Sequence, residues 1–170
     1  MMMIDCWHSA SDQAMTNMEK IRYLWHYTTD PALKSIIQSG LLLPKFGMRV
    51  CEKEPALWFT KNQEWEFYAN KIHKTDGGRD VVLSFKQTAE ILGAVRFGIA
   101  ANDPRLKDWP TSCRIVGTAR ENRRITERHA LKMGSNPLDW CASFEAIPVS
   151  DLLVQLWIEG HGWCNDKPND

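Results

Sequence analysis

The chain has little that would crosslink it or carry it across a membrane. Its 170 residues include five cysteines, an odd number without a C-x-x-C pair. This argues against a disulfide framework and against a zinc site with closely spaced ligands. No apolar run approaches the roughly 20 residues of a membrane-spanning helix. Residues 1–10 lack a basic region followed by an apolar core, so we expect no signal peptide and a cytoplasmic protein.

Net charge and the usual phosphate-binding motifs are absent as well. The formal net charge is zero, so overall charge indicates neither nucleic acid nor an acidic membrane surface as a partner. There is no G-x-G-x-x-G sequence and no P-loop, which excludes the common glycine-rich phosphate cradles. His73, His129 and His161 lie far apart and form no metal-ligand spacing. We therefore expect no metal and no membrane partner.

What is present predicts one folded domain. The hydrophobic fraction is 44% and includes eight tryptophans, and a chain of this length can bury a sizeable core. We assign 1–20 to a leader, 21–159 to the domain and 160–170 to a polar tail. Most tryptophans are expected to fill the core, although some could provide stacking surfaces for a ligand.

The clearest local signals lie near the start of the predicted domain. The apolar and aromatic run 21–27 is typical of a strand. A threonine N-cap and a proline at the first helical position predict a helix over 31–39, which Gly40 closes. His26 is thereby placed beside a helix N-terminus, where a polar or anionic ligand can be held. A histidine in a strand is nevertheless more often structural.

The remaining segments predict an α+β domain without the regular βαβ alternation of a nucleotide-binding parallel sheet. A possible capping box of Thr60 and Gln63 marks the start of a helix. The expected strands are 56–60, 81–85, 94–100, 142–147 and 152–158, the expected helices are 60–72 and 121–133, and the expected turn and loop are 74–80 and 102–112.

One carboxylate stands out within the strand predicted at 142–147. Glu145 follows Phe144 and precedes Ile147, in a strand whose one face is expected to be buried. A carboxylate there needs a partner or a function. The alternative is that side-chain alternation turns Glu145 toward solvent.

Three segments carry a resemblance to a known family. They read HYTTDPALKSIIQSGLL from His26, LWFTKNQEWEFY from Leu57 and FEAIPVSDLL from Phe144. In this order they resemble the ADP-ribosyltransferase superfamily of the His-Tyr-Glu type, which includes diphtheria toxin and poly(ADP-ribose) polymerases. The first and third segments are also similar to DNA-modifying ADP-ribosyltransferase toxins. The resemblance covers 23–70 and 143–158, so the middle of the chain is unmatched.

The resemblance implies both a fold and a reaction. The fold is a single ADP-ribosyltransferase-like domain with a split mixed or antiparallel β core and flanking helices. The reaction uses NAD as a substrate, releases nicotinamide and transfers ADP-ribose to an unknown acceptor, without a metal. Glu145 is the implied catalytic residue, because a fixed carboxylate can stabilise an oxocarbenium-like centre. The residues implied to bind NAD are His26, Tyr27, Thr28, Trp58, Phe59, Thr60 and Tyr68.

The implied roles differ among these residues. His26 hydrogen-bonds a ribose hydroxyl, and Thr60 supports the glutamate. Trp58 stacks on the nicotinamide, although the family usually has tyrosine there. Tyr68 lines the nicotinamide pocket, and a place in the core suits it equally well.

Several functions stay open at this point. NAD hydrolysis is a close variant of transfer. A non-catalytic module that binds NAD, ADP-ribose or a protein is a different class, and an enzyme resembling RNA 2′-phosphotransferases is a third. The acceptor can be a protein, a nucleic acid or a small molecule. The basic helix predicted at 121–133 is most simply a solvated face, and nucleic-acid contact is its functional alternative.

Overall fold

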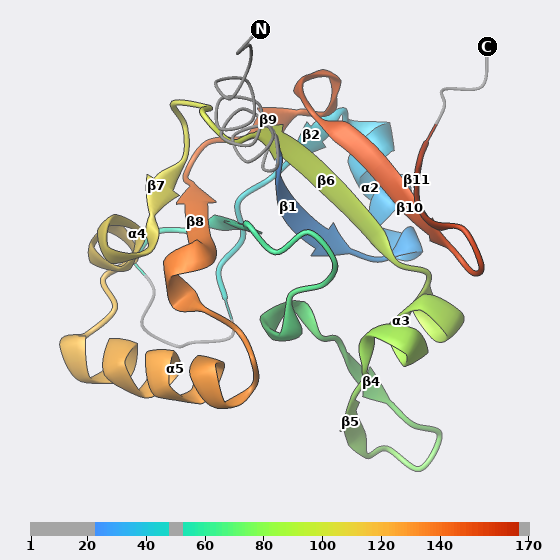
Figure 1. Cartoon of the computed structure of the whole chain (residues 1–170), viewed down its shortest axis with the longest axis horizontal. Coiled ribbons are helices and arrows are strands. Elements are labelled where there is room, and N and C mark those ends of the chain that lie inside the picture. Colours follow the sequence, from blue (N-terminus) through green and yellow to red (C-terminus); the bar gives the residue numbers. More distant parts are fainter. Residues whose placement is uncertain (1–22, 48–52, 167–170) are drawn as a thin grey trace, which may run out of the picture.

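The computed structural model describes residues 23–47 and 53–166 (Figure 1). Within these ranges the chain is α+β, as predicted, with four α-helices and a seven-stranded antiparallel sheet. The predicted leader, 1–20, lies outside the described residues. No helix in the described ranges is both long and apolar enough to cross a membrane.

The large sheet has the strand order β11-β10-β6-β1-β3-β8-β7. Its strands are β1 (Tyr23–Thr28), β3 (Leu57–Thr60), β6 (Val95–Ala100), β7 (Lys107–Asp108), β8 (Trp140–Ser143), β10 (Leu153–Ile158) and β11 (Gly162–Asn165). Two short ladders pair β2 (Leu41–Leu42) with β9 (Ile147–Pro148) and β4 (Ile72–Lys74) with β5 (Asp80–Val82). The helices are α2 (Asp30–Ser39), α3 (Phe85–Leu92), α4 (Trp109–Val116) and α5 (Arg120–Lys132), with single 3-10 turns η1 (Phe67–Ala69), η2 (Pro137–Asp139) and η3 (Val149–Asp151).

Strands β1 and β3 diverge in the middle of this sheet. Strand β1 pairs with β6 over all six of its residues, whereas its register with β3 is the single pair Trp25 and Thr60. Strand β3 then pairs along its whole length with β8. The sheet therefore consists of two well-paired parts that join at one point.

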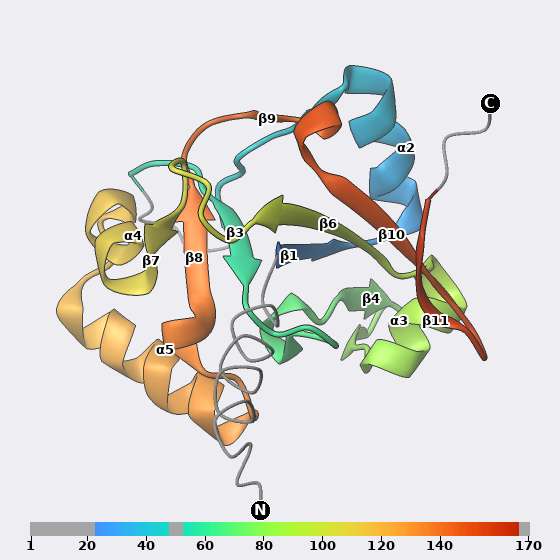
Figure 2. The ribbon, with the colours of Figure 1, turned by 45° about the horizontal axis from the view of Figure 1, so that its top comes forward.

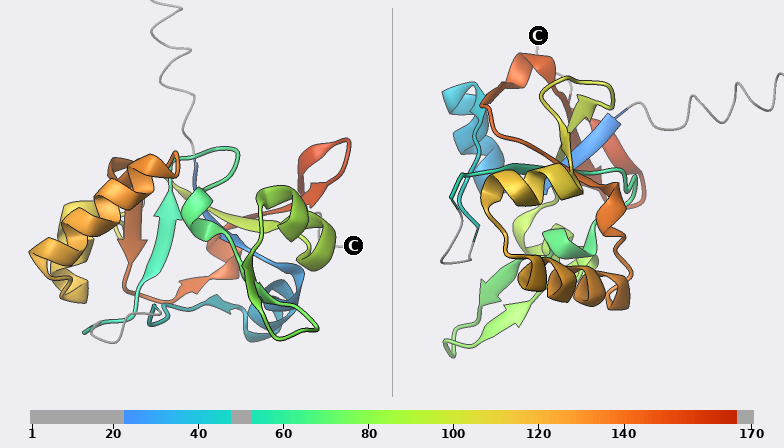
Figure 3. Two further views of the ribbon diagram at one scale, coloured as in Figure 1. Left: turned by 90° about the horizontal axis from the view of Figure 1, so that it is seen from below. Right: turned by 90° about the vertical axis from the view of Figure 1, so that its left-hand side faces the viewer.

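The two faces of the sheet carry different cores. One face holds a mainly aliphatic cluster that includes Leu24, Phe97 and Ile99, and α2 packs on it through Leu33 and Ile36. The opposite face is aromatic, and its tryptophans come from strands, loops and α4. Helix α4 packs against the β7–β8 end of the sheet and α5 lies beside it (Figure 2), while the β4–β5 hairpin projects away from the body (Figures 1 and 3).

Two residues of β6, a glycine and a buried arginine, pack against Trp25 of β1. A Cβ atom on Gly98 would lie 2.6 Å from the Trp25 ring, so glycine allows that ring to lie close over β6. The guanidinium of Arg96, also on β6, lies 3.8 Å from the Trp25 ring centroid and 4.4 Å from that of Trp163. This cation–π stacking compensates a buried charge that forms no ion pair with a described residue.

The elements with strong local signals match the predictions. Helix α2, the left-handed Gly40 with φ of 68°, strands β6 and β10, the 74–80 turn and helix α5 are confirmed. The predicted strand at 21–27 corresponds to β1 within the described residues.

The helix predicted at 60–72 is wrong, because its supposed capping residues have other partners. The Thr60 hydroxyl donates to Glu66, and the Gln63 side-chain oxygen accepts from the Trp25 indole. The segment is irregular up to η1 and then enters β4. Its aromatic side chains consequently do not share one face. Trp65 is buried beside Tyr27, whereas Tyr68 packs against Trp140.

Four further boundaries also differ from the sequence predictions. The predicted strand 81–85 ends early, because Ser84 and Gln87 form a capping box that starts α3. The predicted loop 102–112 contains the start of α4, whose N-cap is Asp108. The predicted strand 142–147 is interrupted after Ser143. The predicted tail instead contributes β11, the edge strand of the sheet.

Candidate functional site

A cavity of about 510 Å³ lies against the aromatic face where β1 and β3 diverge. Strands β1, β3 and β8, the turn η1 and helices α4 and α5 all contribute to its walls. The bordering residues are Trp25, His26, Tyr27, Gly47, Trp58, Phe59, Thr60, Glu66, Tyr68, Ala69, Lys71, Trp109, Val116, Thr118, Thr126 and Trp140.

One wall of the cavity is a continuous row of aromatic rings. Ring centroids are 5.5 Å apart between Trp58 and Trp109, 5.1 Å between Trp109 and Trp140, and 4.8 Å between Trp140 and Tyr68. These distances are typical of favourable aromatic pairs. The Trp109 indole N–H donates to Glu127 of α5 at 2.8 Å, which fixes the ring orientation. The rings are tilted against one another, so this wall is a packed apolar boundary of the cavity.

Glu66 is a buried carboxylate at this wall, and both of its oxygens are saturated. Oε1 accepts from the backbone N–H of Tyr68 at 3.2 Å and from the Ser135 hydroxyl. Oε2 accepts from the Thr60 hydroxyl and the Trp140 indole, both at 3.0 Å. Each oxygen thus receives one N–H and one O–H bond. This arrangement ties η1, β3, β8 and the start of η2 around the cavity.

His26 is held in one neutral tautomer. Its Nδ1 lies 2.9 Å from the carbonyl oxygen of Trp58, which can only accept, so Nδ1 carries the proton and donates. Burial lowers the pKa of His26 from 6.5 to about 4, the backbone hydrogen bond opposes that shift, and the positive charges of Lys71 and Lys45 add to it. At neutral pH Nε2 is therefore a hydrogen-bond acceptor.

We expect this lowered pKa to make the fold sensitive to mild acid. The unfolded state binds a proton on His26 below pH 6.5, and the folded state binds one only near pH 4. The free energy of unfolding should thus fall as pH decreases from 6.5 toward 4, by at most about 3 kcal/mol from this group. Urea unfolding of the wild type, His26→Gln and the exposed control His161→Gln between pH 7.5 and 4.5 measures it. An equally steep loss in His26→Gln would contradict the assignment.

Most of the predicted binding residues meet at this cavity. Of the seven, His26, Tyr27, Trp58, Phe59, Thr60 and Tyr68 border it. Thr28 borders a smaller cavity of about 130 Å³ between α2 and β3, which shares His26 with the larger one. Their roles toward NAD stay predictions.

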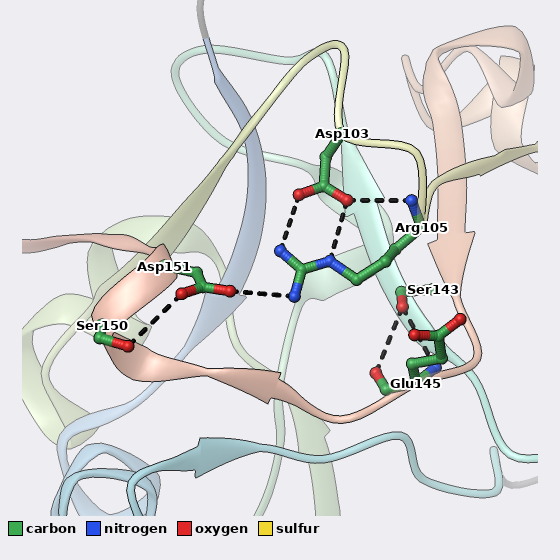
Figure 4. A network of polar contacts seen from close by, with 6 residues as sticks. All are labelled: Asp103, Arg105, Ser143, Glu145, Ser150 and Asp151. Carbon is green, nitrogen blue, oxygen red and sulfur yellow. Dashed lines mark hydrogen bonds and ion pairs between the residues drawn. The ribbon is translucent and has the colours of Figure 1, made fainter.

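Glu145 does not border either cavity. It lies in the bend after β8, and its side chain is exposed. The Ser143 hydroxyl accepts from its backbone N–H and donates to its carbonyl oxygen, both at 3.2 Å (Figure 4). These bonds end the strand, so the expected place of Glu145 inside a strand is wrong. Its catalytic role stays a prediction.

An ion-pair network occupies the neighbourhood of this bend. Arg105 pairs with Asp103 at 2.7 Å and with Asp151 of η3 at 3.1 Å, and Glu145 takes no part in it (Figure 4). The network joins the loop after β6 to η3. Because its guanidinium donates to both Asp103 and Asp151, Arg105 crosslinks these two segments and is a structural residue here.

Several bordering residues were missed by the sequence analysis. Glu66 and Lys71 fall in the segment that was predicted to be a helix. Trp109 and Trp140 lie in the middle of the chain, which the family resemblance does not cover. A carboxylate between two aromatic residues, Trp65 and Phe67, was the available signal. The indole partners of Glu66 and Glu127 could not be read from spacing.

The basic helix α5 also reaches the cavity. Thr126 borders it, and the Tyr68 hydroxyl lies 2.7 Å from Nδ1 of His129. Arg123 forms an ion pair with Glu127 at 2.7 Å, so part of the positive charge is neutralised within the helix.

The described residues contain no cluster of three or more histidine, cysteine, aspartate or glutamate side chains able to hold a metal ion. Comparisons of the chain with protein-family models, curated proteins and solved structures find no match.

Proposed function

We propose that this protein is an NAD-dependent ADP-ribosyltransferase that releases nicotinamide and transfers ADP-ribose to an acceptor. One observation carries the proposal. His26, Trp58, Thr60 and Tyr68, which the sequence resemblance names as binding residues, border one cavity although they belong to three different elements.

The chemistry of the walls suits the nicotinamide riboside half of NAD. The nicotinamide ring of NAD is cationic, and the faces of Trp58 and Tyr68 attract a planar cation. His26 is neutral, and its Nε2 can accept a hydrogen bond from a ribose hydroxyl while Nδ1 stays bound to the Trp58 carbonyl. Thr60 acts indirectly, since its hydroxyl is committed to Glu66.

The sheet supports the finer fold assignment that belongs to this proposal. The resemblance implies a split β core, and the single-pair contact between β1 and β3 divides the sheet at the cavity. The first two segments that carry the resemblance begin in β1 and β3, which are neighbours in the sheet, and the third begins directly after β8, the next strand beyond β3.

Glu66 and Glu145 differ in what they can offer a substrate. Glu66 has four donors on its oxygens and no acceptor capacity left for a ribose hydroxyl. Glu145 is exposed, and its carboxylate forms no ion pair with a described residue. Transfer therefore requires the bend at 144–146 to bring Glu145 to the cavity when NAD binds.

A second function is a non-catalytic module that binds NAD or ADP-ribose. The observation in its favour is the position of Glu145 outside the cavity lining. Both functions require NAD binding, and only the first requires nicotinamide release.

We expect Trp58→Ala to weaken NAD binding by about five- to 150-fold, because stacking on one aromatic ring contributes roughly 1–3 kcal/mol. Trp58→Phe keeps a ring and should recover much of the affinity. Calorimetric titration with NAD measures both, with melting temperatures as the control for folding. Unchanged affinity in folded Trp58→Ala, or saturable zinc binding without any NAD signal, would contradict the proposed site.

A further inference from the structure

Lys71 brings a cation to the aromatic cavity that the proposed NAD contacts do not use. It follows η1, and its ammonium group donates to the carbonyl oxygen of Tyr27 at 3.2 Å. The residue is half-buried and borders the cavity. No described carboxylate lies within ion-pair distance of it. An ammonium group has three N–H donors, so donors remain beyond the Tyr27 bond.

Lys71 is also the only cationic residue among those that border this cavity in the described chain. His26 is neutral at physiological pH, as shown above. Burial lowers the pKa of Lys71, which means that the ammonium has lost part of its hydration without gaining a counter-charge. An anion placed beside the ammonium group would compensate for the lost hydration. The attraction between the two charges is stronger in this partly buried site than in water.

The nearby negative charge of Glu66 does not fill this role. Its carboxylate is bonded to Thr60 and Trp140, at the level of Trp25 in the sheet register. Lys71 is bonded at the level of Tyr27, two residues further along β1. This separation corresponds to about 7 Å along a strand. The two groups thus bond at different levels of the sheet and form no ion pair with each other.

We propose that the cavity binds a planar aromatic molecule that carries an anionic group, a carboxylate or a phosphate, with the anion paired to Lys71. The ring packs against the apolar wall of Trp58, Trp109 and Trp140, which border the cavity and pack on one another. A ligand of this class occupies the same space as nicotinamide and so competes with NAD. The inference itself rests on the cavity and does not require that NAD binds.

The test uses benzoate, phenyl phosphate and benzamide as probes, because benzoate and benzamide have nearly the same shape and differ in charge. Dissociation constants come from ligand-observed NMR and from quenching of the tryptophans that border the cavity. Wild type should bind benzoate or phenyl phosphate, and the tighter of the two identifies the anion. Lys71→Gln should lower the affinity for that anion about ten- to a hundredfold, as expected for the loss of a hydrogen bond to a charged group. The affinity for benzamide should not change.

Two control variants separate charge from folding. Lys86→Gln removes an exposed lysine on α3 and should change nothing. Lys71→Met keeps the apolar stem of the side chain and should behave like Lys71→Gln. It is the variant to use if Lys71→Gln has a lowered melting temperature. The proposal is overturned if wild type binds neither anion, or if the Lys71 variants weaken benzamide as much as benzoate. Anion binding without NAD binding would refute both functions proposed above and leave the present inference standing.

Discussion

Glu145→Gln is expected to lower nicotinamide release from NAD by about a hundred- to a thousandfold, the usual cost of losing an electrostatic contact to the transition state. Glutamine keeps the size and shape of the side chain and removes only the negative charge. That charge acts on the oxocarbenium-like transition state, so the affinity for NAD should change little. Stability should also be unchanged, because the side chain is exposed and forms no ion pair with a described residue.

The measurement is nicotinamide release with and without cell extract as a source of acceptor, beside NAD binding and melting temperature. Glu159→Gln, at another exposed glutamate after β10, is the matched control and should retain full activity. Equal release by wild type and Glu145→Gln would show that Glu145 is not catalytic. NAD binding by wild type without any release would favour the binding-module function.

The sequence predicted those parts of the fold whose signals lie within a few residues of one another. Helix α2 is an example: an extended Thr29 precedes it, a proline lies in its first turn and the left-handed Gly40 ends it, and the helix begins and ends within one residue of the prediction. The strands that hold His26 and Trp58 were also predicted correctly, because apolar and aromatic runs of this length favour strands.

The errors occur where a side chain has a distant partner. Gln63 resembles the third residue of a capping box, but the indole of Trp25 provides a competing donor 38 residues away. Glu66 resembles a residue on a helix face, and its indole and hydroxyl partners are up to 74 residues away. Burial of a carboxylate with such partners depends on the sheet order, which local spacing does not encode.

The position of Glu145 illustrates the same limit. Alternation along an unbroken strand from 142 to 147 gave the residue a defined face. Ser143 breaks that strand by bonding both backbone groups of Glu145, a competition between side chain and ladder that serine and threonine commonly create. Because the strand ends there, alternation no longer determines where the carboxylate points.

Glu66→Leu is expected to reduce the free energy of unfolding by about 3–5 kcal/mol, the largest stability effect that we predict. The site is 6% exposed, and removal of the carboxylate leaves four donors without an acceptor, from Thr60, Tyr68, Ser135 and Trp140. Each buried unsatisfied group costs roughly 1–3 kcal/mol. The two hydroxyls can rotate toward other acceptors, which limits the total.

Glu66→Gln tests the same arrangement more finely, because a glutamine has one acceptor end and one donor end. Each oxygen of Glu66 receives one O–H and one N–H bond. A hydroxyl can turn and accept from the new amide, but the Trp140 indole and the Tyr68 backbone N–H cannot accept. Either orientation of the amide therefore sets two N–H donors against each other, and we expect a loss of about 2–3 kcal/mol. Urea unfolding followed by tryptophan fluorescence, with the exposed Glu64→Gln as control, measures both variants; a Glu66→Gln protein as stable as wild type would show that these four donors do not depend on the carboxylate.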